Sequence, residues 1–308
     1  MIHTEGLSKA FDGRVAVDAI NLDVNEGEVF GFLGPNGAGK TTTVRLLACL
    51  IGPTGGKAWV NGFEVGKEDI NIRRSVGILT ESPGLYDRLS AERNLSIFAD
   101  LYEVPVEQRD KNVRRYLEMM DLWDRRHEMV AGFSKGMKQK MAIARALIHE
   151  PKIVFLDEPT ASLDPEASRV VRDFIEELKA EGHTIFLCTH NLDEADRLCD
   201  RVGVMKQKLV RVDTPANLRR SIFGRTVLLQ PVKITPEITA AVKALPFVKN
   251  VSRSDGGLMI SLDKPEEQNP ALVRAVLQAG GDIQYLSEFK HSLEDVYFSL
   301  VGAGGAGG

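Results

Sequence analysis

The feature that most constrains the fold of this chain is the segment Gly34–Thr41, which fits the pattern G-x-x-x-x-G-K-[ST]. Its glycines permit positive φ angles, so successive backbone N–H groups can turn toward one anion. Lys40 would add a point charge to a phosphate, and the Thr41 hydroxyl is a hard oxygen ligand for Mg²⁺. The apolar run Val29–Leu33 predicts a buried strand before the loop, and Thr42–Leu50 predicts a helix after it. This order places the positive end of a helix at the phosphates.

The composition indicates a soluble globular protein of one large domain or two ordinary ones. Of its 308 residues, 43% are hydrophobic and 27% are charged, which is the usual balance for this class. The net charge of -4 argues against a nucleic-acid-binding protein, which would usually be basic. Cys49 and Cys188 fall within predicted helix and strand, so we expect buried free thiols in a reducing compartment. No apolar run approaches the roughly 18 residues that span a bilayer, so any work at a membrane would require a partner.

The segments on either side of the loop differ in character. Residues 1–28 contain short alternating or apolar runs, which predict strands. Phe11 is either an aromatic that stacks on a nucleotide base or an ordinary core or edge residue, and spacing alone favours the second. Residues 90–149 show helical periodicity instead, and we expect them to form a helical insertion within an α/β domain.

Two neighbouring carboxylates follow a second buried strand. The run Ile153–Leu156 is continuously apolar, as in a parallel strand covered on both faces, and Asp157 and Glu158 come directly after it. Open α/β sheets carry their chemistry at the carboxyl ends of their strands. Asp157 is suited to holding Mg²⁺, and Glu158 to orienting and polarising the water that attacks a γ-phosphate. The alternative is an acidic cap on the following helix, but its pairing with a phosphate loop favours the catalytic interpretation.

A histidine follows the next predicted strand. Thr184–Thr189 reads as a buried strand, and His190 lies at its carboxyl end. A lone histidine is usually structural or on the surface. Because the same sheet edge also carries Lys40 and Asp157, we expect His190 to contact the γ-phosphate.

In these motifs, the chain from about Met1 to Arg220 resembles the ATP-binding subunit of ABC transporters, with every motif in the order of that family. The resemblance implies an α/β fold: an ABC-type P-loop NTPase domain with a RecA-like core, an antiparallel β subdomain and a helical subdomain. It implies catalytic roles for Glu158 and His190, and a D-loop at residues 162–164. The implied ATP contacts are Phe11, Gly34, Pro35, Asn36, Gly37, Ala38, Gly39, Lys40, Thr41, Thr42, Ser134 and Gly136. The implied Mg²⁺ ligands are Thr41, Glu81 and Asp157.

The signature sequence of the family, Leu-Ser-Gly-Gly-Gln, is matched only in part. Its serine and second glycine are kept as Ser134 and Gly136, which by themselves predict an ordinary N-cap that can also bind an anion. Lys135 replaces the first glycine and Met137 replaces the glutamine. Glu81 stands where the family usually has the glutamine of the Q-loop, and a carboxylate ligates Mg²⁺ at least as well as an amide. These departures resemble the branch whose permeases are of the ABC-2 export type.

The resemblance also implies partners. In this family the signature of one subunit faces the phosphate loop of a second subunit, with ATP between them. Since the chain has one copy of each motif and keeps its catalytic residues, a homodimer with two equivalent sites is the simplest assembly. We expect it to drive transport, with export as the direction, through a separate integral membrane permease of the ABC-2 type. The resemblance places it in the cytoplasm, peripheral on the cytoplasmic face of the membrane, with no nucleic acid as a partner.

Two other classes of ATPase are alternatives. Soluble ABC ATPases of translation or DNA repair usually carry two ATPase modules in one chain, a coiled-coil insert or an Fe–S domain, and none is visible here. A P-loop NTPase outside the ABC family is disfavoured by the helical insertion, whose segment Ser134–Gly136 stands directly upstream of Asp157.

The sequence beyond Phe223 is separate, with the predicted order β-α-β-β-α-β of the split βαβ pattern. We therefore expect an ATP-binding domain at 1–221, with its helical subdomain at about 88–150, and a small α+β domain at 222–301. Residues 302–308 read as a flexible glycine-rich tail. The small domain resembles the C-terminal extensions of the ABC-2 branch. A regulatory or dimer-supporting role for it competes with a purely structural one.

Overall fold

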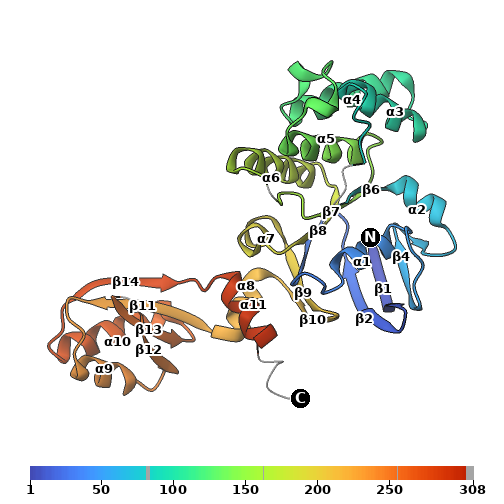
Figure 1. Cartoon of the computed structure of the whole chain (residues 1–308). Coiled ribbons are helices and arrows are strands. Elements are labelled where there is room, and N and C mark those ends of the chain that lie inside the picture. The colour runs from blue at the N-terminus through green and yellow to red at the C-terminus, as the bar shows by residue number, and fades with distance from the viewer. Residues whose placement is uncertain (81–83, 162, 255, 303–308) are drawn as a thin grey trace. The chain divides into compact units, whose positions relative to one another are not determined.

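The computed structural model describes residues 1–80, 84–161, 163–254 and 256–302, and its contacts divide the chain into two units (Figure 1). The first unit is Met1–Thr214 and the second is Pro215–Gly308. The boundary expected at residue 221 falls inside helix α8 (Pro215–Phe223), which groups with the second unit. Each unit has a hydrophobic core of its own.

A six-stranded sheet organises the first unit. Its strand order is β10-β9-β3-β8-β7-β6, with β10 antiparallel at one edge and all other neighbours parallel. The strands are β3 (Val29–Leu33), β6 (Val76–Leu79), β7 (Ile153–Asp157), β8 (Thr184–Thr189), β9 (Arg201–Lys206) and β10 (Lys208–Asp213). Every residue of β3, β7 and β8 is buried, which agrees with their continuous apolar runs.

Four aromatic rings join the central strands. The rings of Phe30, Phe32 and Phe155 lie 5.5, 5.2 and 5.7 Å from the ring of Phe186, centroid to centroid. Tilted pairs at these distances each contribute about 0.5–1.5 kcal/mol beyond the burial of their area. This packing fixes β3, β7 and β8 relative to one another, and the predicted catalytic residues follow the carboxyl ends of these strands.

A second sheet of four strands, in the order β2-β1-β4-β5, forms the antiparallel β subdomain. Its strands are β1 (Ile2–Phe11), β2 (Arg14–Val24), β4 (Gly55–Val60) and β5 (Phe63–Glu64). Side chains of β1 and β2 such as Leu7 and Ile20 belong to the same core cluster as Phe30 and Phe32. The two sheets of the first unit therefore share one core.

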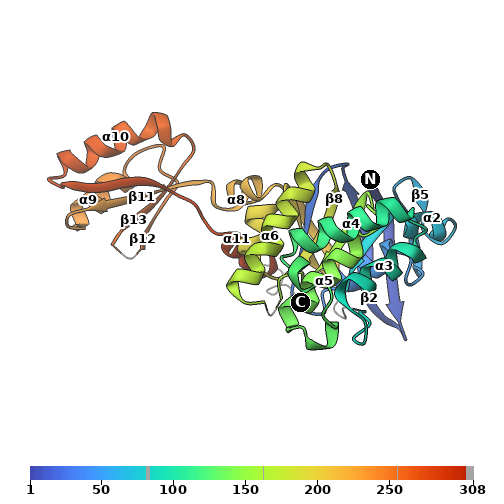
Figure 2. The same ribbon diagram turned by 90° about the horizontal axis from the view of Figure 1, so that it is seen from above.

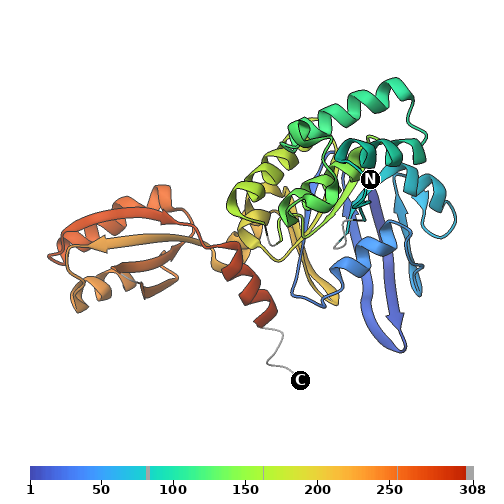
Figure 3. The ribbon, with the colours of Figure 1, turned by 45° about the horizontal axis from the view of Figure 1, so that its top comes forward.

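The expected helical insertion is present as a group of helices. It contains α3 (Ala91–Leu101), α4 (Val106–Met119), η1 (Trp123–Arg125), η2 (Val130–Gly132) and α5 (Lys135–Leu147). Figure 3 shows α3, α4 and α5 gathered together, and α3 packs against both of the others. Serine side chains cap two of these helices: the hydroxyl of Ser90 accepts from Arg93 N, and that of Ser134 accepts from Met137 N.

The remaining helices of the first unit are α1 (Lys40–Leu47), α2 (Asp69–Ser75), α6 (Pro165–Ala180) and α7 (Leu192–Leu198). In Figure 2, α6 lies beside α5. The loop helix was predicted to reach Leu50, and that end was wrong. Cys49 takes the left-handed conformation, with φ +55°, while Leu50 N donates to Arg45 O and Cys49 N to Leu46 O. These are the two bonds of a Schellman motif, which ends the helix before Cys49.

The second unit has a four-stranded antiparallel sheet in the order β12-β13-β11-β14. Its strands are β11 (Arg225–Pro231), β12 (Asn250–Ser254), β13 (Gly257–Leu262) and β14 (Ile283–Phe289), and its other helices are α9 (Pro236–Lys243), α10 (Pro265–Gln278) and α11 (Leu293–Gly302). Ile238, Val242, Leu272 and Val276 of α9 and α10 pack on this sheet. No helix within the described residues is long and apolar enough to cross a membrane.

Candidate functional site

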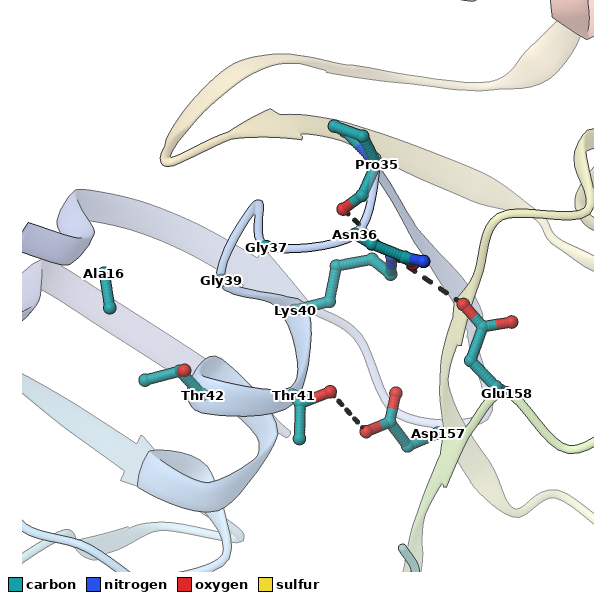
Figure 4. A pocket seen from close by; sticks show the side chains of 10 residues that line it. All are labelled: Ala16, Pro35, Asn36, Gly37, Gly39, Lys40, Thr41, Thr42, Asp157 and Glu158. Atoms are coloured by element: carbon teal, nitrogen blue, oxygen red, sulfur yellow. Dashed lines mark hydrogen bonds and ion pairs between the residues drawn. The ribbon is translucent and has the colours of Figure 1, made fainter. Parts of the chain in front are cut away.

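The loop between β3 and α1 borders a cavity of about 250 Å³. The lining residues come from β2, the loop, α1 and the end of β7: Ala16, Pro35, Asn36, Gly37, Gly39, Lys40, Thr41, Thr42, Asp157 and Glu158 (Figure 4). Gly37 and Gly39 have φ angles of +80° and +101°. A Cβ atom on Gly39 would lie 2.3 Å from the carbonyl oxygen of Ala16, so no side chain fits there. The glycines thus allow a tight turn at the N-terminus of α1, where an anion is favoured.

Lys40 brings a positive charge into this cavity. Its side chain is only 6% exposed, and its Nζ donates to the carbonyl oxygen of Gly34 at 2.6 Å. The same Nζ lies 3.7 Å from Oε1 of Glu158. An ammonium group at the N-terminus of a helix can bind a phosphate group, whose charged oxygens would accept further hydrogen bonds from it.

Two hard oxygen donors meet beside Lys40. The hydroxyl of Thr41, on the first turn of α1, donates to Oδ2 of Asp157, at the end of β7, at 2.6 Å. A hydroxyl and a carboxylate next to a phosphate site form the type of donor set that Mg²⁺ takes. The residues present therefore fit a magnesium ion. Glu81, the third predicted ligand, lies outside the described residues.

Glu158 and His190 form a pair at the carboxyl ends of β7 and β8. Nδ1 of His190 donates to Oε2 of Glu158 at 2.8 Å. Glu158 has a φ angle of +52°, unusual for a residue with a side chain, and its N–H donates to Cys188 O. This strained conformation aims the carboxylate toward the cavity, which Glu158 lines. In this structure both carboxylate oxygens face a partner, Oε1 toward Nζ of Lys40 and Oε2 toward Nδ1 of His190.

The three cysteines take no part in this chemistry. Cys49, Cys188 and Cys199 are buried free thiols. Burial is the main cause that raises the pKa of the Cys49 thiol to about 12, and burial also holds the pKa of Cys188 well above its usual range. The thiols therefore stay protonated at neutral pH, and none is a nucleophile.

Phe11 lies apart from the cavity lining. It ends β1 next to the turn into β2, its side chain is 46% exposed, and Nζ of Lys9 lies 5.1 Å from its ring centroid. The residue of this sheet that lines the cavity is Ala16 on β2. Sequence reasoning missed Ala16 because an alanine carries no chemical signal.

Ser134 and Gly136 line a different cavity, of about 160 Å³, together with Lys140 of the same helix and Asp164, the N-cap of α6. Lys135 is exposed on the first turn of α5. One chain therefore does not bring the N-terminus of α5 to the cavity of the phosphate loop. The N-termini of α1 and α5 therefore border two separate cavities in one copy of the chain.

Comparison with known proteins identifies the family. Residues 17–161 match the family described as ABC transporter, and residues 214–301 match the C-terminal domain of DrrA1-3-like ATP-binding proteins. The chain is 30% identical to the linearmycin resistance ATP-binding protein LnrL of Bacillus subtilis, over 98% of each chain. The protein belongs to the ATP-binding subunits of ABC transporters. It is an ABC ATPase of the DrrA-like branch, which is the ABC-2 exporter type.

Further relatives of this ABC subunit also match along its whole length. It is 32% identical to the daunorubicin resistance ATP-binding protein DrrA3 of Streptomyces coeruleorubidus, over 98% of this chain and 96% of the relative. It is also 32% identical to the bacitracin transport ATP-binding protein BcrA of Bacillus licheniformis, over 100% of this chain and 99% of the relative.

Solved structures match the ABC ATPase fold. The structure of an ATP-binding subunit of an ABC transporter matches with a TM-score of 0.67 and 31% identity, over 72% of this chain and 92% of that chain. A dimeric ATP-binding cassette, MJ0796, in a post-hydrolysis state with ADP and Pi matches with a TM-score of 0.64 and 26% identity, over 70% and 98%. The predicted fold class and ATP as the nucleotide are thereby confirmed.

Proposed function

We propose that two copies of this ABC ATPase bind ATP–Mg²⁺ between them and hydrolyse it, and that hydrolysis drives export through a separate ABC-2-type permease. The protein would act in the cytoplasm, attached to the inner face of the membrane through that permease. The observation that carries this proposal is a cluster at one cavity, lined by Lys40, Thr41, Asp157 and Glu158, with His190 hydrogen-bonded to Glu158.

The geometry of the cluster supports a separate role for each of its residues. Lys40 and the backbone of the loop would bind the β- and γ-phosphates, because they supply the cation and the helix N-terminus. Thr41 and Asp157 would hold Mg²⁺, which supplies neutralisation of the phosphate charge when bound. Glu158 would take a proton from the attacking water, while His190 orients the carboxylate and contacts the γ-phosphate.

The homodimer rests on the separation of the two half-sites. Ser134 and Gly136 would contact ATP bound by a second copy, because their cavity and the loop cavity of the same chain share no residue. The chain provides both halves, so two copies suffice. The dimeric MJ0796 cassette supports this assembly.

Export rests on the relatives and on the second unit. Relatives that match along the whole chain are named for resistance to linearmycin and daunorubicin, and for bacitracin transport.

We propose an ATP-binding domain at 1–221, with its helical subdomain at about 88–150, and a small domain at 222–301. Phe11 would reach the adenine only if its strand end shifts on nucleotide binding, since it lies outside the cavity lining here.

Co-expression with a candidate six-helix permease tests the proposal. The protein should fractionate with membranes when the permease is present and should leave them when it is replaced by an unrelated membrane protein. ATPase activity of the purified complex should respond to the permease. A protein that stays in the soluble fraction with every candidate permease would instead favour the class of soluble ABC ATPases.

A further inference from the structure

The second unit contains a cavity remote in sequence from every ATPase motif. The cavity has a volume of about 270 Å³ and is lined by residues of α8, the start of β11, the end of β14 and the two residues after it. Its charged and titratable lining residues are Arg219, Arg220, Arg225, Glu288, Lys290 and His291. None of these residues has a role in the proposed function.

Positive charge is concentrated in this cavity. Residues 215–308 contain ten Lys and Arg against nine Asp and Glu, so the unit as a whole is nearly neutral. The cavity lining includes four of those ten basic residues but only one of the nine acidic residues. Because like charges lining one cavity repel each other, this arrangement favours an anion between them.

Among the described residues, two of the four cations have no counter-charge. Arg225 binds both oxygens of Glu266, at 2.7 and 2.8 Å, and also Oε1 of Glu288 at 2.9 Å. It is therefore neutralised by its own domain. Arg220 and Lys290 form no ion pair or side-chain hydrogen bond within the described part of the chain. They come from α8 and from the residue after β14, so one ligand between them would join two elements.

Neutral hydrogen-bonding groups accompany these cations. Nε2 of His291 lies 3.2 Å from the hydroxyl of Thr226, and both residues line the cavity. The ring of His291 stacks on Phe223, with centroids 4.0 Å apart, which fixes its orientation. Burial lowers the pKa of His291, against the opposing effect of Asp295, whose Oδ2 lies 3.8 Å from Nδ1, so the site favours the neutral form of the ring.

We infer that this cavity binds a phosphate group, held by Arg220 and Lys290. A phosphate monoester carries a charge of about −1.5 to −2 at pH 7, which matches the two unpaired cations. Guanidinium and ammonium groups both donate charge-assisted hydrogen bonds to phosphate oxygens. The phosphate belongs either to a small soluble phosphomonoester or to a lipid headgroup, and both present the same chemistry. The site shares no residue with the ATPase site, so it stands independently of the proposed function.

His291 provides a local probe for this site in the full-length protein. We would titrate glycerol 3-phosphate and follow the imidazole resonances by NMR, assigning His291 with His291→Gln. A phosphate beside the ring should raise the pKa of His291, because it stabilises the imidazolium. Arg220→Ala with Lys290→Ala should weaken the apparent affinity about tenfold or more, the effect of removing charged hydrogen bonds. Lys233→Ala with Lys243→Ala removes two exposed lysines of the same unit and should change nothing.

The inference is overturned if His291 does not respond to glycerol 3-phosphate, or if acetate at equal ionic strength gives the same response. It is equally overturned if the Arg220→Ala, Lys290→Ala protein responds like its parent. Should the double variant misfold, Arg220→Gln and Lys290→Gln as single changes remove the charge but keep a polar side chain, and they give the same comparison. Vesicles of phosphatidylcholine with and without phosphatidic acid identify the source. Capture by phosphatidic acid vesicles that is lost in the variant supports a lipid headgroup, and a response to glycerol 3-phosphate alone supports a soluble ligand.

Discussion

Nζ of Lys40 lies 3.7 Å from Oε1 of Glu158, and the second carboxylate oxygen accepts a hydrogen bond from Nδ1 of His190 at 2.8 Å. The residue proposed to bind phosphate and the residue proposed to act on water thus neutralise each other in this structure. Nucleotide binding would replace the contact between Lys40 and Glu158 by contacts between Lys40 and phosphate. The site would then become competent for hydrolysis only once nucleotide is bound, because the carboxylate is released by the same event.

Lys40→Ala should remove most ATP binding. The loop loses the ammonium that lies within the cavity, and the backbone N–H groups alone carry no full charge. Nucleotide affinity would be measured by calorimetry with and without Mg²⁺. Lys57→Ala, a change at an exposed lysine of β4, is the matched control and should bind as the parent does. Equal affinities in all three proteins would refute the assignment of the loop.

Thr41→Val should separate metal binding from nucleotide binding. Valine keeps the shape of threonine but lacks the hydroxyl that lies 2.6 Å from Asp157. ATP affinity without Mg²⁺ should remain near that of the parent, while the gain on adding Mg²⁺ should be lost. Thr41→Ser keeps the hydroxyl and should retain the gain. If Mg²⁺ raises the ATP affinity of Thr41→Val as much as it raises that of the parent, Thr41 is not a ligand.

Gly39→Ala and Gly37→Ala should differ sharply. Both positions have positive φ, so alanine is strained at each by about 1–2 kcal/mol. Only at Gly39 would the new Cβ meet backbone, 2.3 Å from the oxygen of Ala16, whereas nothing lies within 4 Å at Gly37. Gly39→Ala should therefore lose ATP affinity and more unfolding free energy than Gly37→Ala. Chemical denaturation and nucleotide titration test the pair, and equal losses would mean that the approach to Ala16 is unimportant.

His149 should make the stability depend on pH. Burial lowers the pKa of His149 to about 4, while its Nε2–H donates to Val76 O at 3.1 Å. Because the unfolded chain has the ordinary pKa near 6.5, the unfolded state binds more protons below that pH. The contribution is complete above pH 6.5 and falls by roughly 3 kcal/mol as the pH decreases to 4, with no further loss below.

The free energy of unfolding would be measured at pH 7 and pH 5 for the parent and for His149→Gln. The variant has no group titrating at this position, so its stability should decline less between the two values. His127→Gln, at an exposed histidine, should decline as the parent does. If the free energy of unfolding declines equally in the parent and in His149→Gln between pH 7 and pH 5, another group causes the pH dependence.

The strands of the central sheet were readable from sequence because their apolar runs are continuous. Val29–Leu33 and Thr184–Thr189 have the predicted bounds, since both strands are buried on both faces. The end of α1 was not readable, because Cys49 takes a left-handed conformation that glycine or asparagine would normally signal.

The sequence predicted which residues form the site, but not which of them contact one another. The strand ends place Lys40, Asp157, Glu158 and His190 at one edge of the sheet. The pairing of Glu158 with both Lys40 and His190 depends on its positive φ, for which the sequence has no glycine to signal it. Ala16 enters from β2 through the tertiary fold alone.

Glu158→Gln tests the central claim most directly. Glutamine keeps the size of the side chain and can still accept from His190, but it lacks the negative charge that takes a proton from water. Hydrolysis should fall by ~10²-fold or more, the typical contribution of a positioned general base. ATP binding should survive, because Lys40 and Thr41 are unchanged.

With ATP bound and not consumed, the variant should accumulate as a dimer. Light scattering on Glu158→Gln with ATP–Mg²⁺ should give the mass of two chains, and the same protein with ADP should give the mass of one. A variant that hydrolyses ATP at the parental rate, or that stays a single chain with ATP–Mg²⁺ bound, would contradict the account of Glu158 as the base in an ATP-dependent dimer.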